Sequence, residues 1–166
     1  RDAAWPADQR AVRTVVCAAF GQSEEADLVD ALYAERAVLV SLVALAEGRC
    51  AGHILFSRMW IDLASGESIP AVSLAPLAVA PEFQKLGIGS ALARAGLEAC
   101  GSLGLGERMV LVLGHRDYYP RFGFSAELAR GLEHPFKADH FMALELERGA
   151  LDGVRGKVRY AKAFGI

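Results

Sequence analysis

Apolar residues recur along the chain at two different spacings, and each spacing predicts one kind of secondary structure. After Pro6 and Asp8, apolar residues return every three or four positions up to Phe20, which predicts a helix that ends at Gly21. A second helix is expected over 23–35, because its apolar positions share this period and acidic residues follow Ser23, the expected capping residue.

Between residues 38 and 79 the pattern changes to runs of β-branched and apolar residues separated by turns. These runs predict strands over 38–45, 50–61 and 69–79, of which the first two form a hairpin. Pro76 lies inside the third run and has no N–H to donate to a neighbouring strand. We therefore expect a bulge or a splay of the sheet at Pro76.

The remaining chain alternates between helical and extended patterns. The sequence predicts a helix over 87–102, a buried strand over 109–113, a short helix over 117–122, a strand beginning at Phe124, a strand over 141–146 and an edge pairing over 156–160. No repeat, low-complexity stretch or linker interrupts this order, so residues 1–166 are expected to form a single domain. The expected fold class is α+β, with helices flanking a mixed, mostly antiparallel sheet.

Composition and charge argue against several classes of function. The formal net charge of −2 favours neither nucleic acid nor an anionic membrane as a partner. The three cysteines lie far apart and the four histidines are scattered, so neither a disulfide framework nor a metal site is expected. No signal peptide and no apolar run long enough to cross a bilayer is visible in the sequence, which begins at Arg1. A reducing, cytoplasmic location is the simplest interpretation.

The strongest candidate for chemistry is the segment Leu77–Ser90, where a strand ends, a turn follows and two glycines open a helix. The first amides of a helix have no partner within the helix, and the helix dipole adds partial positive charge there. A phosphate group fits such a site, and Gly87 and Gly89 let the backbone approach its oxygens closely. An ordinary strand-to-helix turn that uses glycine for its geometry is the alternative. A Walker loop and a dinucleotide fingerprint are both disfavoured, since the first lacks Gly-Lys-Ser/Thr and the second would need a third glycine at Leu92.

Two motifs give this segment a more specific meaning. The first closely resembles the cofactor signature of the GNAT superfamily of acetyltransferases and reads Val79-x-Pro81-Glu82-Phe83-Gln84-x-x-Gly87-x-Gly89. The second follows at the family's separation, resembles its aromatic-Tyr-x-x-aliphatic-Gly-Phe motif, and reads Tyr118-Tyr119-Pro120-Arg121-Phe122-Gly123-Phe124. The resemblance covers about residues 1–146, and residues 147–166 resemble the tail of a bacterial subgroup described as predicted acetyltransferases.

The resemblance implies a GNAT-like sheet with a splayed strand pair, N-acetyltransferase activity, acetyl-CoA as co-substrate and no metal. The cofactor's pyrophosphate would be bound by Gln84, Lys85, Leu86, Gly87, Ile88, Gly89 and Ser90. The pantetheine arm would hydrogen-bond to Leu77, Ala78 and Val79 like an added strand. Pro76 would then keep the sheet open beside that arm, unless its bulge is incidental.

The resemblance also assigns Tyr119 as the general acid, which would give a proton to the thiolate leaving group. The alternative for Tyr119 is a core aromatic with a satisfied hydroxyl, and Tyr118 is expected to pack. Many family members carry a basic carboxylate on the strand before the loop, but residues 74–77 hold no acidic residue. His115, with Asp117 nearby, is a candidate base, and an ordinary loop histidine is the alternative. The amine could instead lose its proton to solvent before it binds.

The resemblance also implies that the acceptor is a primary amine of a small molecule or a peptide, which enters opposite the cofactor near residues 20–22 and 133–136. Direct attack within a ternary complex is expected, because no cysteine has the surroundings of a nucleophile. Two other functions stay open: a non-catalytic acyl-CoA-binding or regulatory module, which the missing carboxylate supports, and transfer of a longer acyl group. The protein is expected to be a monomer or a homodimer.

Overall fold

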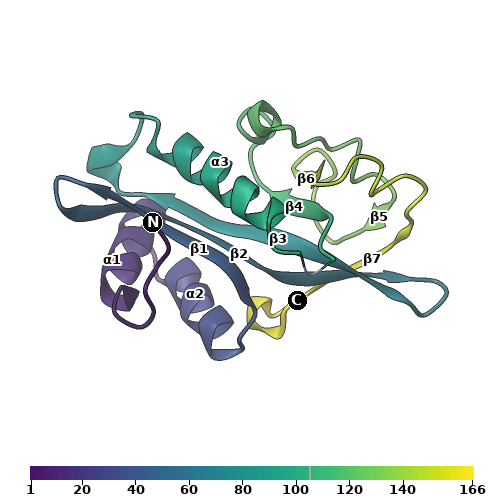
Figure 1. The fold of residues 1–166 in the computed structure, drawn as a ribbon, viewed down its shortest axis with the longest axis horizontal. Coiled ribbons are helices and arrows are strands. Elements are labelled where there is room, and N and C mark those ends of the chain that lie inside the picture. The colour runs from purple at the N-terminus through teal and green to yellow at the C-terminus, as the bar shows by residue number, and fades with distance from the viewer. Residues whose placement is uncertain (105) are drawn as a thin grey trace.

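The computed structural model describes residues 1–104 and 106–166, in which a twisted sheet separates two layers of helices (Figure 1). The strands are β1 (Val38–Ala46), β2 (Arg49–Leu63), β3 (Ser68–Val79), β4 (Met109–Leu113), β5 (Leu132–Glu133), β6 (Phe141–Glu145) and β7 (Gly156–Tyr160). The α-helices are α1 (Gln9–Phe20), α2 (Glu24–Ala34) and α3 (Ile88–Gly101). Short 3-10 helices are η1 (Pro81–Phe83), η2 (Tyr119–Phe122) and η3 (Lys162–Phe164).

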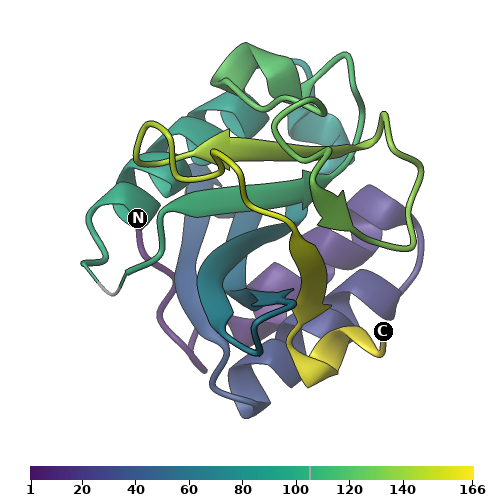
Figure 2. The ribbon, with the colours of Figure 1, turned by 90° about the vertical axis from the view of Figure 1, so that its right-hand side faces the viewer.

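The long strand β2 organises the sheet. One of its edges pairs antiparallel with β1 along its first half and with β7 along its second half, and its other edge pairs antiparallel with β3. Strand β4 lies parallel to β3 and antiparallel to β6, while the short β5 lies parallel to β7 (Figure 2). The sheet is therefore mixed and mostly antiparallel, which confirms the expected fold class.

Strands β3 and β4 diverge soon after they meet. Within the described residues, their ladder consists of the pairs Val72–Val110 and Ser73–Leu111. Just beyond, Ala75 and Pro76 interrupt the register between β3 and β2. The predicted bulge and splay at Pro76 are both confirmed. Among the described strands, none pairs with the second half of β3 on the β4 side.

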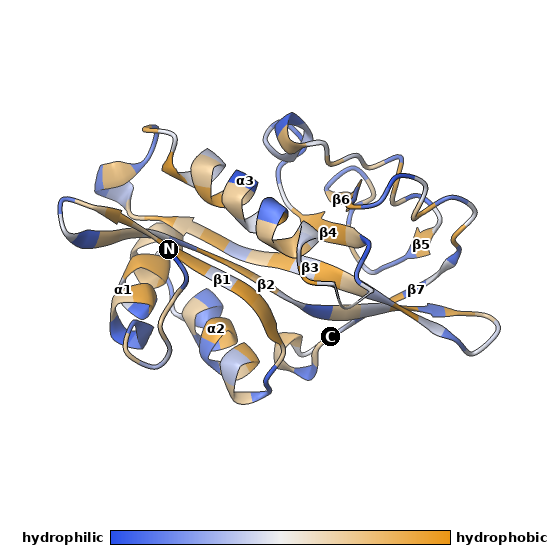
Figure 3. Cartoon of the chain, viewed as in Figure 1, coloured by the Kyte–Doolittle hydropathy of each residue, from blue (hydrophilic) through white to orange (hydrophobic). Residues whose placement is uncertain are grey.

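Helices cover the two faces of the sheet unequally. Helices α1 and α2 lie on one face and α3 lies on the other (Figure 1). The strands between them are predominantly apolar (Figure 3), and side chains such as Leu55 on one face and Phe56 on the other are fully buried. Helix α3 packs very closely, because a β-carbon at Gly96 would lie 2.2 Å from the ring of Phe56. The start of α3 also lies close to the sheet, because a β-carbon at Gly52 of β2 would lie 3.2 Å from the Ile88 side chain.

Four expectations need correction or completion. Ser23 precedes α2, but its hydroxyl donates to the Asp27 carboxylate at 3.3 Å rather than to a backbone amide. The strand predicted from Phe124 is wrong: an isolated bridge from Ser125 to Ala143 replaces it, because the chain turns again at once. Strand β5 was not predicted. It places 156–160 between two strands rather than at the edge, since β7 pairs with both β2 and β5.

Candidate functional site

The segment between β3 and α3 forms a loop whose backbone faces a hollow. Lys85 and Gly87 both adopt left-handed conformations, with φ of 64° and 86°, and α3 begins directly afterwards at Ile88. This geometry leaves the first amides of α3 without partners in the helix. The hollow has a volume of about 420 Å³ and is lined by Val79, Phe83, Gln84, Lys85, Gly87, Ile88, Gly89, Ser90, Tyr118 and Arg121. Free amides, a helix dipole and basic side chains together suit an anionic ligand.

Two lining residues of this hollow were not indicated as ligands by the sequence. They are Tyr118, which precedes η2, and Arg121, which lies within it. The hydroxyl of Tyr118 lies 3.0 Å from the position that a β-carbon on Gly89 would occupy. The Arg121 guanidinium lies 4.4 Å from the centre of the Tyr118 ring, and its Nε donates to the Tyr118 carbonyl at 2.9 Å. Tyr118 also packs edge-on against Tyr119, as expected. Arg121 stands inside the second motif, but only the fold shows that it reaches the phosphate loop.

Of the predicted phosphate-binding residues, Leu86 alone is absent from this lining, and its side chain is exposed to solvent. Gln84 lines the hollow, and its side-chain amide donates to the Val79 carbonyl at 3.0 Å. That hydrogen bond ties the loop to the end of β3. The loop residues therefore come together as the first motif predicts.

The open edge of β3 offers backbone groups to the splay. Ala80 donates to the Ala51 carbonyl at 2.8 Å, which makes Gly52 and Val79 a pair without direct hydrogen bonds. Because hydrogen bonding alternates along an antiparallel ladder, Val79 and Leu77 direct their backbone groups away from β2 and into the splay. The backbone of Ala78 faces β2 instead, and its side chain is buried.

A second cavity, of about 440 Å³, contains Tyr119. It is lined by Ala19, Phe20, Glu25, Leu28, Leu74, Ala75, Pro76, Leu77, Val79, Gln84, Leu113, Gly114, His115 and Tyr119. The walls therefore come from α1, α2, the bulged half of β3, the end of β4 and η2. Val79 and Gln84 line both this cavity and the phosphate hollow, so the two meet at the end of β3.

Burial controls the acidity of Tyr119. The half-buried ring packs edge-on against Phe124 at a centroid distance of 5.7 Å. Burial, with a smaller contribution from Tyr118, raises the pKa of the Tyr119 hydroxyl to about 12. A phenol of that pKa keeps its proton at neutral pH, which is the form that a general acid needs.

The other predicted residues divide between this cavity and its surroundings. His115 lies on an exposed loop and lines the Tyr119 cavity, while Asp117 does not line it. Phe20 lines it as expected, but the predicted loop 133–136 is not part of the described lining. Glu25 also lines the cavity, although the sequence did not single it out as a site residue. An acidic residue in the first turn of a helix is already explained by its favourable interaction with the helix dipole.

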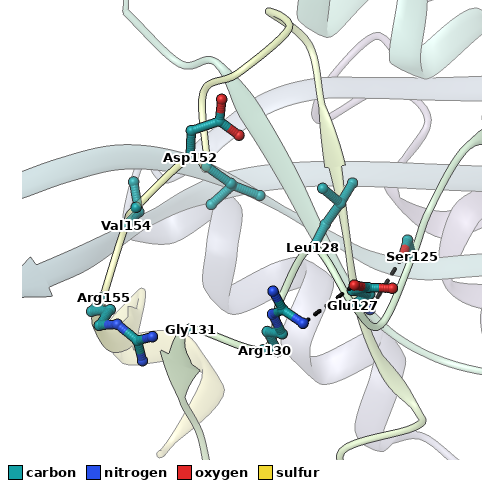
Figure 4. Close-up of a pocket in the computed structure, with 10 residues that line it drawn as sticks. Ser125, Glu127, Leu128, Arg130, Gly131, Asp152, Val154 and Arg155 are labelled. Carbon is teal, nitrogen blue, oxygen red and sulfur yellow. Dashed lines mark hydrogen bonds and ion pairs between the residues drawn. The ribbon is translucent and has the colours of Figure 1, made fainter.

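A third hollow, of about 490 Å³, lies away from these residues, between the 125–131 loop and the 151–155 segment (Figure 4). Charges of both signs surround it, and Arg130 is paired with Glu127 at 3.2 Å. None of the predicted site residues lines it. Within the described residues, no group of three or more histidine, cysteine or acidic side chains could hold a metal ion, and no helix is long and apolar enough to cross a bilayer.

Sequence comparisons identify relatives for most of the chain. Residues 9–124 match the model of the acetyltransferase (GNAT) family. The uncharacterized N-acetyltransferase YjhQ of Escherichia coli K12 is 43% identical over 119 residues, which cover 70% of this chain but only 64% of YjhQ. The uncharacterized N-acetyltransferase YhbS of the same strain is 30% identical over 162 residues, covering 96% of this chain and 94% of YhbS.

Structural comparisons agree over the whole length. The crystal structure of YhbS from Escherichia coli in complex with CoA aligns with a TM-score of 0.89 and 29% identity, covering 100% of this chain and 91% of that one. A GNAT family acetyltransferase from Brucella melitensis in complex with acetyl-CoA aligns with a TM-score of 0.79 and 35% identity, covering 99% and 96%.

Proposed function

The chain belongs to the acetyltransferase (GNAT) family and is an acyltransferase, and from this premise we propose that it transfers the acetyl group of acetyl-CoA directly to a primary amine. The observation that carries the proposal is the junction of two cavities at Val79 and Gln84. One cavity suits a diphosphate and the other contains a protonated phenol. A molecule with a pyrophosphate at one end and a thioester at the other fits across this junction.

The phosphate hollow fits the pyrophosphate of acetyl-CoA in charge and in shape. The amides of Gly87 to Ser90 open α3, and the cationic side chains of Lys85 and Arg121 lie at the same hollow. Gly89 leaves room between the helix and Tyr118, where a β-carbon would lie 3.0 Å from the hydroxyl. CoA and acetyl-CoA complexes of the two structural relatives support this assignment.

The splay fits the pantetheine arm. Leu77 presents its amide and carbonyl, and Val79 its amide, on the open side of β3, where a second chain of amides can pair with them. The Val79 carbonyl already accepts a hydrogen bond from the Gln84 side chain. Pro76 helps to keep β4 away from this edge, because the bulge at Ala75 and Pro76 begins where the β3–β4 ladder stops. The arm would then lead from the phosphate hollow toward Tyr119.

Tyr119 supplies the acid for the reaction. The amine nitrogen forms a bond to the acetyl carbon, the carbon–sulfur bond breaks, and the sulfur leaves as a thiolate. Tyr119 gives its proton to that thiolate, and the nitrogen loses its proton to a base. Burial raises the pKa of the Tyr119 hydroxyl to about 12, so the phenol carries its proton when this step begins. His115 lines the same cavity and is the base suggested by the sequence.

Direct attack on the thioester is favoured over transfer through a cysteine. None of Cys17, Cys50 and Cys100 lines the Tyr119 cavity. Burial raises the pKa of the Cys50 thiol, and it raises that of Cys100 to about 12. A thiol that keeps its proton is a poor nucleophile, so a covalent acetyl-cysteine route lacks a suitable residue.

Amine-dependent release of thiol from acetyl-CoA tests the proposal. The protein is mixed with acetyl-CoA and a panel of primary amines, and free thiol is followed with a chromogenic reagent. We expect release above the amine-free rate for some of the amines. Binding of acetyl-CoA without release for any amine would favour the alternative of a non-catalytic acyl-CoA-binding module, while a preference for longer acyl-CoA donors would favour the alternative acyl group.

A further inference from the structure

The Tyr119 cavity has an apolar wall with one carboxylate in it. Among its described lining residues, the acidic side chain is Glu25, from the first turn of α2. Most of the others are apolar. They include Phe20 and Leu113, two large hydrophobic residues that are 42% and 47% exposed. An acceptor that fits this lining has an apolar part for Phe20 and Leu113 and a charge opposite to that of Glu25.

Glu25 has no cationic side chain as a partner in the described part of the chain. Its two carboxylate oxygens accept hydrogen bonds from the Gln22 side-chain amide, at 2.9 and 3.1 Å, and none of the ion pairs involves it. The neighbouring acidic residue Asp27 is paired with Arg13 at 2.6 Å. A half-buried carboxylate beside apolar groups attracts a cation more strongly than one in bulk water.

The surroundings of the cavity reinforce this preference. Glu24 and Glu25 both lie in the first turn of α2, whereas the charge of Asp27 in the same turn is offset by Arg13. Within the described lining, His115 is the side chain that can carry a positive charge. The negative charge near the cavity favours entry of cationic molecules over anionic ones.

We infer that Glu25 binds the acceptor in its ammonium form, so that the acceptor is a primary amine, protonated at neutral pH, joined to an apolar carbon chain. The carboxylate accepts N–H hydrogen bonds from the ammonium group, and the chain lies along Phe20 and Leu113. This inference rests on the proposed function, because it names the class of amine that the enzyme acetylates.

Equilibrium binding tests the inference without requiring turnover. n-Hexylamine hydrochloride is titrated into the protein and followed by backbone NMR shifts, with 1-hexanol as the uncharged probe of matching length. We expect the ammonium to bind at least about tenfold more tightly than hexanol, a difference of about 1.4 kcal/mol. Glu25→Gln should remove this preference.

Glu24→Gln is the matched control, because Glu24 is the preceding residue of the same helical turn and does not line the cavity. It should keep the wild-type preference for the ammonium. Equal binding of both probes to the wild type, or equal losses in the two variants, would overturn the inference. Glu25→Ala provides a second variant without the charge and should also lose the preference. Thermal unfolding of every variant shows whether a loss of binding comes from a damaged fold.

Kinetics separate this inference from the proposed function. In a wild type that acetylates n-hexylamine, Glu25→Gln should raise the KM for the amine about tenfold or more and leave the KM for acetyl-CoA unchanged. An unchanged amine KM would overturn the inference and leave the acetyltransferase activity standing. If the wild type acetylates no amine, the proposed function fails, and the NMR titration still decides whether Glu25 binds an ammonium.

Discussion

The ring of Tyr119 lies directly against the backbone of Gly114, so closely that a β-carbon at Gly114 would fall 2.3 Å from the ring's Cε2 atom. Gly114 follows β4, and its amide donates to the His140 carbonyl at 2.9 Å, which fixes its position. The end of β4 therefore serves as a flat support for the tyrosine ring. Any side chain at this position must move either Tyr119 or the strand end.

Gly114→Ala should displace Tyr119 and lower kcat by about tenfold to a hundredfold, because a shift of about 1 Å at a reacting group has effects of this size. Binding of acetyl-CoA should change little, since Gly114 does not line the phosphate hollow. Steady-state kinetics and calorimetry measure the two effects. In a Tyr119→Phe background, Gly114→Ala should lower kcat only slightly further. If the two substitutions instead reduce kcat independently, Gly114 acts by a route other than Tyr119.

Tyr119→Phe should reduce kcat by about tenfold or more, because it removes the proton donor without changing the packing of the ring. Tyr118→Phe serves as the comparison. Its hydroxyl lies at Gly89 in the phosphate hollow, so this variant should mainly raise the KM for acetyl-CoA. A wild-type kcat in Tyr119→Phe would remove this residue from the mechanism.

Gly89→Val should weaken acetyl-CoA binding by about tenfold or more, or about 1.4 kcal/mol, because the side chain would fill the space between α3 and Tyr118. Gly101→Val provides the control on the same helix, since a β-carbon at Gly101 meets no atom within 4 Å. Isothermal titration with acetyl-CoA measures both variants. Undiminished affinity in Gly89→Val would contradict the location of the pyrophosphate.

The sequence predicted the elements whose apolar period is unambiguous, and it predicted the loop whose geometry depends on local residues. The helices and long strands lie within a few residues of the expected bounds, and Pro76 indicated the splay through its missing N–H. The two-residue strand β5 has no alternation to detect. Phe124 is a single buried residue, and burial alone does not tell a strand from a turn.

The lining of the candidate site could be predicted where it follows from one continuous segment, and could not where it depends on packing. Gln84 to Gly89 lie together because they are consecutive. Arg121 and Glu25 reach the cavities only because η2 and α2 fold back toward the end of β3. Their spacing in the sequence carries no sign of this, and Glu25 had a sufficient local explanation in the helix dipole.

His53 gives the fold a dependence on acid that is independent of the reaction. It is fully buried on β2, its Nε2 lies in a hydrogen bond 2.9 Å from the Ser41 hydroxyl, and its Nδ1 has no partner in the described structure. Burial lowers the pKa of His53 from an ordinary value of 6.5 to about 4. The folded protein therefore resists protonation that the unfolded chain accepts.

As pH falls from about 6.5 to about 4, this histidine should reduce the free energy of unfolding by up to about 1.4 kcal/mol per pH unit, or about 3 kcal/mol in all. Above pH 6.5, the pKa of the histidine in the unfolded chain, His53 is neutral in both the folded and the unfolded protein, and it no longer makes stability depend on pH. Urea unfolding of the wild type and of His53→Leu at several pH values measures it. The variant should lose less stability across this window, and parallel curves would contradict the burial of a neutral imidazole.

The most direct test of acetyl transfer compares two products in one reaction. The wild-type protein is incubated with acetyl-CoA and n-hexylamine, and free thiol and N-acetylhexylamine are quantified at successive times by absorbance and mass spectrometry. The two products should rise together in equal amounts, and both should fall about tenfold or more in Tyr119→Phe. Release of thiol without the acetylated amine would contradict the account. So would the absence of both products with n-hexylamine and with every other amine of the panel, while acetyl-CoA binds.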